Sequence, residues 1–398
     1  MPALKKSPLA DHNPLSCAKL PLPFAWSEDQ VTTTQNRDTE IRLRKLLSTQ
    51  SVRLRQGPHV DKPDVPRFVS YDQLRRPDGT VVGRKKVILM SGGCSVPTCT
   101  MCPFTNENNY GLGRDSAALL EQVDAVLSRG ADEPAYSTLA LYNDGSFFAP
   151  REVPFDIQLA IAERVARVGV THLVVESLPQ FITAEALGPF VERLGSVKLE
   201  IGVGLQSSDD LVRETLVNTR ITKSVFERAV DVMRNHGAAP KIYLMIKPPF
   251  LTDGEAITDV TQSVAYVRDL GVAGVTLCPT RVSRNTVAWQ LYERGQYRPP
   301  NLWTVVEAVR RTHEITAVRV ACINLRGTDF ESVFPDSCPR CADAVVDALV
   351  LFSETGDPAD LPAVCSCQPA IVTAPLEHSV IIERALLALA ATDAQAPP

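Results

Sequence analysis

The sequence predicts an α/β fold in which parallel strands alternate with helices, followed by a small cysteine-rich C-terminal module. Three observations predict it. Short β-branched apolar runs alternate with amphipathic helical patterns from Lys86 onward. Polar residues follow each apolar run at the point where a strand would end. Beyond the alternating region, four cysteines gather in two close pairs.

The alternating region contains six strand–helix units, which imply parallel strands covered by helices. The predicted strands are residues 86–91, 138–142, 172–176, 197–203, 241–246 and 272–277. The predicted helices between them are residues 116–128, with Asp115 as the N-cap, 155–168, 184–194, 223–236 and 255–268. Six units are too few for a closed eightfold barrel, so an open doubly wound sheet and a partial barrel both fit.

Composition divides the chain into five segments. Residues 1–40 are rich in proline and polar residues, and we expect a flexible arm there. An N-terminal extension (41–85), the strand–helix region (86–290) and the cysteine-rich module (291–376), with a helix at 342–352, follow in order. A terminal helix and tail (377–398) complete the prediction.

Charge and cysteine usage limit the classes of function. The formal net charge is −5, so no global basic field attracts nucleic acid. No apolar run reaches the roughly 18 residues of a membrane span, and we expect no secretory signal at the start. Most of the ten cysteines lie in close clusters, which favours metal binding over disulfides and a cytoplasmic location.

One loop after the first predicted strand carries Cys94, Cys99 and Cys102. Three thiolates held this close can bind three irons of a cubane [4Fe–4S] cluster and leave the fourth iron open to another ligand. A tetrahedral zinc site needs four ligands, and no fourth Cys or His lies nearby in sequence. The alternatives are a zinc site completed by a distant ligand, and buried free thiols.

Polar side chains follow the other five strands, and the carboxyl ends of parallel strands are where such folds bind ligands. These candidates, in chain order, are Asp144, Gly145, Ser146, Glu176, Ser177, Gln206, Ser207, Lys247 and Cys278. Each also has a structural alternative. Asp144 to Ser146 can form an ordinary turn, Glu176 can pair with a loop arginine, and Lys247 can be a solvated lysine.

The second set of cysteines is Cys338, Cys341, Cys365 and Cys367. Four thiolates in two close pairs are the ligand set of a closed structural zinc site, which we favour. An auxiliary iron–sulfur cluster requires the same four thiolates, and unliganded thiols are the third alternative. We expect the metal to attach a small C-terminal module to the strand–helix region.

Several segments together resemble a known family. In order, they are DGSFFAPREVP (144–154), VVESLPQFIT (174–183), GVGLQSSDDLVRETL (202–216), YLMIKPPFLTDGEAITD (243–259) and YRPPNLW (297–303). With the two cysteine pairs and the three-cysteine loop, the chain resembles the radical S-adenosylmethionine (SAM) superfamily. Within it, the resemblance is to the archaeosine synthase beta subunit and Elongator catalytic subunit-like proteins, over residues 42 to 376.

The resemblance implies a partial (β/α)6 TIM-like barrel, a [4Fe–4S] cluster on the three-cysteine loop, and SAM on its open iron. Asp144, Gly145 and Ser146 then lie where the superfamily contacts the SAM amino group. Glu176, Ser177, Gln206 and Ser207 are expected to bind SAM as well. Lys247 and Cys278 are expected to act at the substrate, with Lys247 contacting an anionic group.

The family's implied activity is radical cleavage of a carbon–nitrogen bond in a lysine-bearing deazaguanine of tRNA. This chain departs from the family pattern in its cysteine gap, at Leu178 (usually Arg) and at Cys278 (usually Asn). We therefore expect a radical SAM enzyme for a small amino-acid- or nucleoside-derived metabolite, reduced by flavodoxin or ferredoxin. A tRNA-modifying lyase and a non-catalytic iron–sulfur redox sensor are the alternatives.

Overall fold

The computed structural model describes residues 28–55, 64–76, 79–104, 116–128, 130, 132–321 and 332–393. The chain forms two compact units, residues 1–38 and 39–398. Helix α1 (Glu28–Leu54) begins in the first unit, so residues 28–40 of the predicted arm are helical, in a stretch without glycine or proline. Residues 1–27, the predicted N-cap Asp115 and residues 394–398 of the predicted tail lie outside the described residues.

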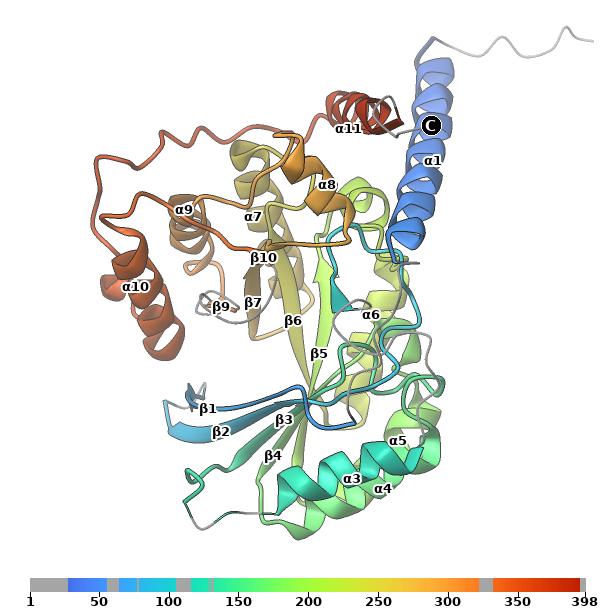
Figure 1. Ribbon diagram of the computed structural model, residues 1–398, viewed down its shortest axis with the longest axis vertical. Helices are drawn as coiled ribbons and strands as arrows, with labels where there is room; N and C mark the ends of the chain where they lie inside the picture. Colours follow the sequence, from blue (N-terminus) through green and yellow to red (C-terminus); the bar gives the residue numbers. More distant parts are fainter. Residues whose placement is uncertain are drawn as a thin grey trace, which may run out of the picture. The chain divides into compact units, whose positions relative to one another are not determined.

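An eight-stranded sheet forms the centre of the second unit (Figure 1). In pairing order its strands are β1 (Phe68–Arg75), β2 (Val81–Ile88), β3 (Thr138–Tyr142), β4 (His172–Glu176), β5 (Lys198–Gln206), β6 (Ala239–Ile246), β7 (Gly274–Pro279) and β9 (Ala317–Val320). A separate short pair joins β8 (Val282–Ser283) to β10 (Ser332–Val333).

Helices follow the strands along the chain. They are α3 (Ser116–Leu127), α4 (Phe155–Arg167), α5 (Ala184–Leu194), α6 (Lys223–Asn235), α7 (Asp253–Asp269), α8 (Val287–Glu293), α9 (Leu302–Thr312), α10 (Ala342–Thr355) and α11 (His378–Asp393). Shorter turns are a π-helix (Leu211–Leu216) and 3₁₀ turns at Pro179–Phe181 and Pro358–Asp360. Within the described part of the chain, no helix has the length and apolar character needed to cross a membrane.

Strand order decides between the two architectures that the sequence leaves open. All pairs from β2 to β9 are parallel, and every strand lies beside the strand that precedes it in the sheet. Right-handed crossovers in strictly sequential order place all helices on one face of the sheet, whereas a doubly wound sheet reverses its order. The fold is therefore a curled half-barrel with its helices outside (Figure 1), and the partial-barrel prediction is confirmed.

Alternation along the strands gives the half-barrel two unlike faces. In β5 and β6 the buried apolar side chains beneath the helices are Leu199, Ile201, Val203, Leu205, Ile242, Leu244 and Ile246. The residues between them, which face the concave side, are Glu200, Gly202, Gly204, Gln206, Lys241, Tyr243 and Met245. Successive strand side chains point to opposite faces, so the core lies outside the curl and the polar residues inside it.

The two edge strands were not predicted. β1 pairs antiparallel with β2, from Phe68↔Ile88 to Arg75↔Val81. Because of this pairing, β2 begins at Val81, five residues before the predicted start at 86. Its residues alternate between half-buried and exposed, as an edge strand requires, so the apolar signal is weak. β9 has four residues. Arg319 of β9 donates a hydrogen bond to the carbonyl oxygen of Arg75, which shows that the curl brings both edges close together.

A second apolar cluster supports the rim of the half-barrel at the carboxyl ends of its strands. It joins α1 through Leu43 and Leu47, the π-helix through Leu216, and α11 through Ile381. Helix α7 begins at a capping box formed by Thr252 and Glu255. Arg384 of α11 is paired with Glu255 at 2.7 Å, so the terminal helix is held at the start of α7.

Candidate functional site

The three-cysteine loop and the polar residues after each parallel strand share one rim of the half-barrel. The strand ends are neighbours in register, as in the pairs Ile88↔Tyr142, Glu176↔Gly202 and Met245↔Cys278. The polar strand ends that the sequence singles out are therefore assembled at one end of the barrel, which is the position at which such folds bind ligands.

The three loop thiols suit an iron–sulfur cluster better than a single metal ion. None of Cys94, Cys99 and Cys102 forms a disulfide, and each is half-buried. Burial raises the pKa of Cys94 and of Cys99. The neighbouring Cys102 thiol adds to this effect at Cys99, whose pKa is raised to about 12. Thiolates held in such surroundings need a bound cation, which iron would provide. Among the described residues, these thiols do not form a compact single-ion group, whereas a cubane binds each thiolate through a different iron.

The cysteine loop is anchored to the segment after the π-helix. Thr100 donates from its hydroxyl to the carbonyl of Leu216 at 2.6 Å and from its backbone N–H to Val217 at 3.0 Å. The Thr98 hydroxyl donates to the carbonyl of Asn218 at 2.9 Å. These bonds hold the residues between and beside the cysteines against the 216–218 segment.

Arg55, the residue after α1, also holds this loop. Its guanidinium donates to the carbonyl oxygens of Pro97, Cys99 (2.6 Å) and Cys102 (2.8 Å). The side chain is buried, with 3% of its surface exposed. No local sequence signal relates Arg55 to this loop, which lies some 40 residues further along the chain.

Glu152 joins the cysteine loop to the loop after β3. One carboxylate oxygen accepts from the backbone N–H of Ser95 at 2.8 Å and from its hydroxyl at 2.6 Å. The other oxygen accepts from the backbone N–H of Ser146. A Cβ at Gly145 would lie 2.1 Å from Glu152 Oε2, so only glycine fits at Gly145. Glu152 lies within the family-like segment 144–154, but its role was not predicted.

The loop after β3 carries one compensated charge and one unpartnered amide. The carboxylate of Asp144 is 2.8 Å from the guanidinium of Arg67 and almost fully buried, so its charge is balanced within the protein. Asn143, with 1% of its surface exposed, has no hydrogen-bond partner for either side-chain amide atom among the described residues. The Ser91 hydroxyl donates to the Asn143 carbonyl at 2.7 Å, which places this amide beside the cysteine loop.

Glu176 lies in a cluster with two tyrosines on the concave face. Burial raises the pKa of the Glu176 carboxyl, and a hydrogen bond from Tyr243 and the charge of Lys241 oppose this shift. Burial also raises the pKa of Tyr142 and Tyr243, with the Glu176 charge adding to the effect. Gly202 provides the space, because a Cβ there would lie 2.7 Å from the Tyr243 ring and 2.8 Å from Glu176 Cγ.

Three predicted cofactor-binding residues use their side chains within the protein. The Ser207 hydroxyl donates to Asp259 of α7 at 2.5 Å, so it faces the helix layer. Burial raises the pKa of Asp259 to about 8. The Ser177 hydroxyl donates to the Leu178 carbonyl at 3.3 Å. Ser146 accepts from the Leu178 backbone N–H at 3.2 Å.

Three predicted site residues lie at the carboxyl ends of neighbouring strands. Gln206 is the last residue of β5, Lys247 directly follows β6, and Cys278 is the last but one residue of β7. Gln206 has φ +69° and folds its side chain over Gly204. Lys247 has φ +60°, and its ammonium lies 2.8 Å from Asp253 Oδ2. Cys278 is half-buried, and its thiol lies 3.9 Å from the Thr276 carbonyl oxygen. The rim therefore brings all three together, with the Lys247 charge already paired.

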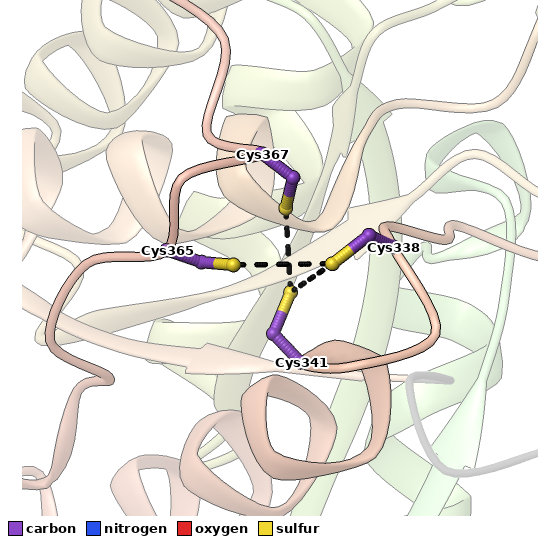
Figure 2. Close-up of side chains that lie close together, drawn as sticks. All are labelled: Cys338, Cys341, Cys365 and Cys367. Carbon is purple, nitrogen blue, oxygen red and sulfur yellow. Dashed lines mark hydrogen bonds between the residues drawn. The ribbon is translucent and has the colours of Figure 1, made fainter.

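The four C-terminal cysteines converge at one point (Figure 2). The Sγ atom of Cys338 lies 3.6 Å from Sγ of Cys341 and 3.8 Å from Sγ of Cys365. The Sγ atoms of Cys341 and Cys367 are 3.5 Å apart. Four thiolates about 2.3 Å from a tetrahedral zinc have sulfurs about 3.8 Å apart. Hydrogen bonds, of which the one with Cys367 has the largest effect, lower the pKa of Cys338 to about 6. The geometry matches a single tetrahedral ion, because a cubane would separate the sulfurs further.

Comparisons with known proteins show relatives of one kind. No protein-family model matches the chain. Archaeosine synthase subunit beta of Methanosarcina acetivorans is 29% identical over 297 residues, which cover 71% of this chain and 82% of the relative. The Thermococcus kodakarensis protein of the same name is 25% identical over 247 residues, covering 61% and 75%.

Among solved structures, methylornithine synthase aligns over 92% of this chain and 93% of its own, with 11% identity and a TM-score of 0.46. Elp3 of Methanocaldococcus infernus aligns over 61% of this chain and 58% of its own, with 16% identity and a TM-score of 0.42. By sequence, the chain is a relative of archaeosine synthase subunit beta, to which it is similar over 71% of its length.

Proposed function

We propose that this enzyme holds a [4Fe–4S] cluster on Cys94, Cys99 and Cys102, binds SAM at the open iron, and abstracts hydrogen from a small amino-acid- or nucleoside-derived metabolite. The observation that carries the proposal is the preformed cysteine loop at the rim where all the polar strand ends meet. When bound and reduced, the cluster supplies the electron that cleaves SAM to a 5′-deoxyadenosyl radical.

The chain's own residues would position SAM and shield the reaction from water. The loop after β3 would present its backbone to the SAM amino group, because Gly145 and Ser146 are held in place by Glu152. The unpartnered Asn143 amide is a further polar group beside this loop. Glu176 and Gln206 would contact the ribose or amino groups from the neighbouring strands. Reduced flavodoxin or ferredoxin would supply the electron.

The concave face supports a small polar substrate. It carries a charged floor in which Arg84 is paired with Asp72 at 2.7 Å and Lys241 with Glu200 at 3.4 Å. Above this floor lie Tyr142, Tyr243, Glu176 and Cys278. Lys86 also lies 2.9 Å from Asp72, so the charges are only partly matched within the protein, and this face suits a compact molecule with its own polar groups.

A tRNA-modifying lyase is the second candidate. The relatives are named for the synthesis of archaeosine, a modified nucleoside. One surface of α1 also carries the exposed basic residues Arg42, Lys45 and Arg53, which would contact phosphates. The third alternative, a non-catalytic redox sensor, has no support from the relatives, which are named as subunits of a synthase, and is not proposed.

The decisive experiment is anaerobic reconstitution followed by incubation with SAM and dithionite. We expect 5′-deoxyadenosine by mass spectrometry from the wild-type protein and from Cys278→Ala, and none from Cys99→Ala, which also loses iron. Formation of methylthioadenosine instead would show cleavage of a different sulfonium bond. Retained cleavage by Cys99→Ala would contradict the ligand assignment.

The two substrate candidates separate in the same assay. Deuterium from a labelled substrate enters 5′-deoxyadenosine only when that substrate is the hydrogen donor. We expect transfer from small metabolites in a deuterated cell-extract fraction below about 1 kDa. Transfer only from tRNA, with binding that weakens steeply as salt rises, would support the lyase instead.

We also propose that Cys338, Cys341, Cys365 and Cys367 bind one structural zinc ion, supported by their sulfur separations of 3.5 to 3.8 Å. Metal analysis of anaerobically purified protein should give about one zinc beside about four irons. About eight irons and no zinc would identify an auxiliary cluster. Clustered free thiols also support the proposed cytoplasmic location.

A further inference from the structure

Arg55 is a buried cation without a counter-ion among the described side chains. Arg55 is 3% exposed, and its guanidinium donates hydrogen bonds to three carbonyl oxygens of the cysteine loop. The Nε atom has no hydrogen-bond partner among the described residues. Burying a guanidinium without a carboxylate is unfavourable unless negative charge is present nearby. The three loop thiolates would provide that charge.

Glu152 is the opposite case on the other side of the loop. Glu152 is 5% exposed, and its carboxylate accepts hydrogen bonds from the N–H and O–H of Ser95 and from the N–H of Ser146, with no cationic side chain among its partners in the described part of the chain. Burial raises the pKa of the Glu152 carboxyl, whereas the hydrogen bonds from Ser95 and Ser146 oppose this shift and favour the ionised form. Arg55 contacts the Cys99 and Cys102 end of the loop, whereas Glu152 contacts the residue after Cys94.

We infer that Arg55 and Glu152 are positioning residues that hold the cluster loop from its two ends and shift the cluster's reduction potential in opposite directions. This inference rests on the proposed cluster. Reduction adds an electron, so a fixed positive charge favours the reduced form and a fixed negative charge opposes it.

The geometry also couples the cluster loop to α1. Ser48 of this helix accepts hydrogen bonds from Asn218 and Arg220, each at 2.9 Å, and Asn218 in turn accepts from Thr98 of the loop. Arg55 follows the last turn, with its N–H donating to the Val52 carbonyl. Helix α1 therefore supports the loop directly through Arg55 and indirectly through the 218–220 segment.

The test is an EPR-monitored redox titration of reconstituted full-length protein at pH 8, together with iron analysis. We expect Arg55→Gln to give a more negative midpoint potential than wild type, and Glu152→Gln a less negative one. Arg55→Lys keeps the charge and should stay close to the wild-type potential while losing iron occupancy, because it cannot bond all three carbonyls. Arg167→Gln, which removes an exposed arginine from α4, is the matched control and should change neither quantity.

Shifts of the same sign for Arg55→Gln and Glu152→Gln, or no shift in either, would overturn the inference. So would an equal shift in Arg55→Lys and Arg55→Gln. If Arg55→Gln binds no iron, Arg55→Lys and Glu152→Gln decide the question. Failure of the wild type to assemble a cluster refutes the proposed function itself. Wild-type assembly and 5′-deoxyadenosine formation with unchanged variant potentials refute only this inference.

Discussion

The ammonium of Lys247 lies 2.8 Å from Oδ2 of Asp253, while the second oxygen of that carboxylate accepts a hydrogen bond from Thr304 at 2.6 Å. The pair connects the end of β6 to the first turn of α7 and to α9. The Lys247 carbonyl also accepts a hydrogen bond from the Tyr297 hydroxyl. A lysine expected to contact an anionic ligand is thus held in position by a carboxylate of the protein.

This pairing predicts a specific mutational pattern. Asp253→Asn leaves the Lys247 ammonium without its counter-charge and should lower the free energy of unfolding by ~1–2 kcal/mol, since the pair is only partly buried. Urea denaturation measures the loss. Lys247→Met should raise the KM for an anionic substrate, whereas the double variant should recover part of the stability lost in Asp253→Asn. If the double variant is the least stable of the three, the pair is not the reason for the Asp253 effect.

Gly202 should be intolerant of alanine. A Cβ would approach Tyr243 and Glu176 within 2.8 Å, so both side chains must move from the concave face. We expect Gly202→Ala to cost ~1–3 kcal/mol of stability and to reduce SAM cleavage or substrate turnover at least tenfold. Gly130→Ala is the control, because no described atom lies within 4 Å of its Cβ position. Wild-type turnover by Gly202→Ala would place the substrate elsewhere.

Asp259 predicts a pH dependence of stability. Its folded-state pKa is raised by burial from 3.8 to about 8, so between these values the folded protein binds a proton that the unfolded chain does not. This contribution is complete below about pH 4 and is lost as pH rises toward 8, by up to ~1.4 kcal/mol per pH unit. Asp259→Asn should therefore become progressively more stable relative to wild type from pH 5 to 8. Urea titrations with parallel pH profiles would argue against this assignment.

The four-cysteine site predicts that zinc can be removed without loss of the iron bound at the three-cysteine loop. Cys341→Ser should remove the zinc and lower the Tm by roughly 5 °C or more, because metal binding contributes to folding free energy. Iron content and 5′-deoxyadenosine formation should stay near wild type. Cys278→Ser, which has no part in this site, should keep its zinc. Loss of iron in Cys341→Ser would assign the C-terminal cysteines to a cluster.

The apolar periodicity by itself determined most of the half-barrel. β3 and β4 have the predicted bounds, because runs such as Leu173 to Val175 are buried against the helices and end at a polar residue. The three-cysteine loop and each close cysteine pair are local as well, since ligands a few residues apart come together in a single turn or loop, whereas the tertiary structure brings the two pairs together. A strand's polar last residue could likewise be assigned to one rim before any contact was known.

Strand order was decided only by the tertiary structure, because the periodicity of each strand is the same in a doubly wound sheet and in a half-barrel. The edge strands β1 and β9 also escaped prediction, since pairing with one neighbour needs little apolar sequence. The sequence also could not predict which partner each polar side chain contacts. Ser207 faces Asp259, and Lys247 pairs with Asp253. Arg55 and Glu152 hold the cysteine loop. Local sequence encodes which face of an element is apolar, whereas contacts between residues tens of positions apart exist only once the sheet has curled.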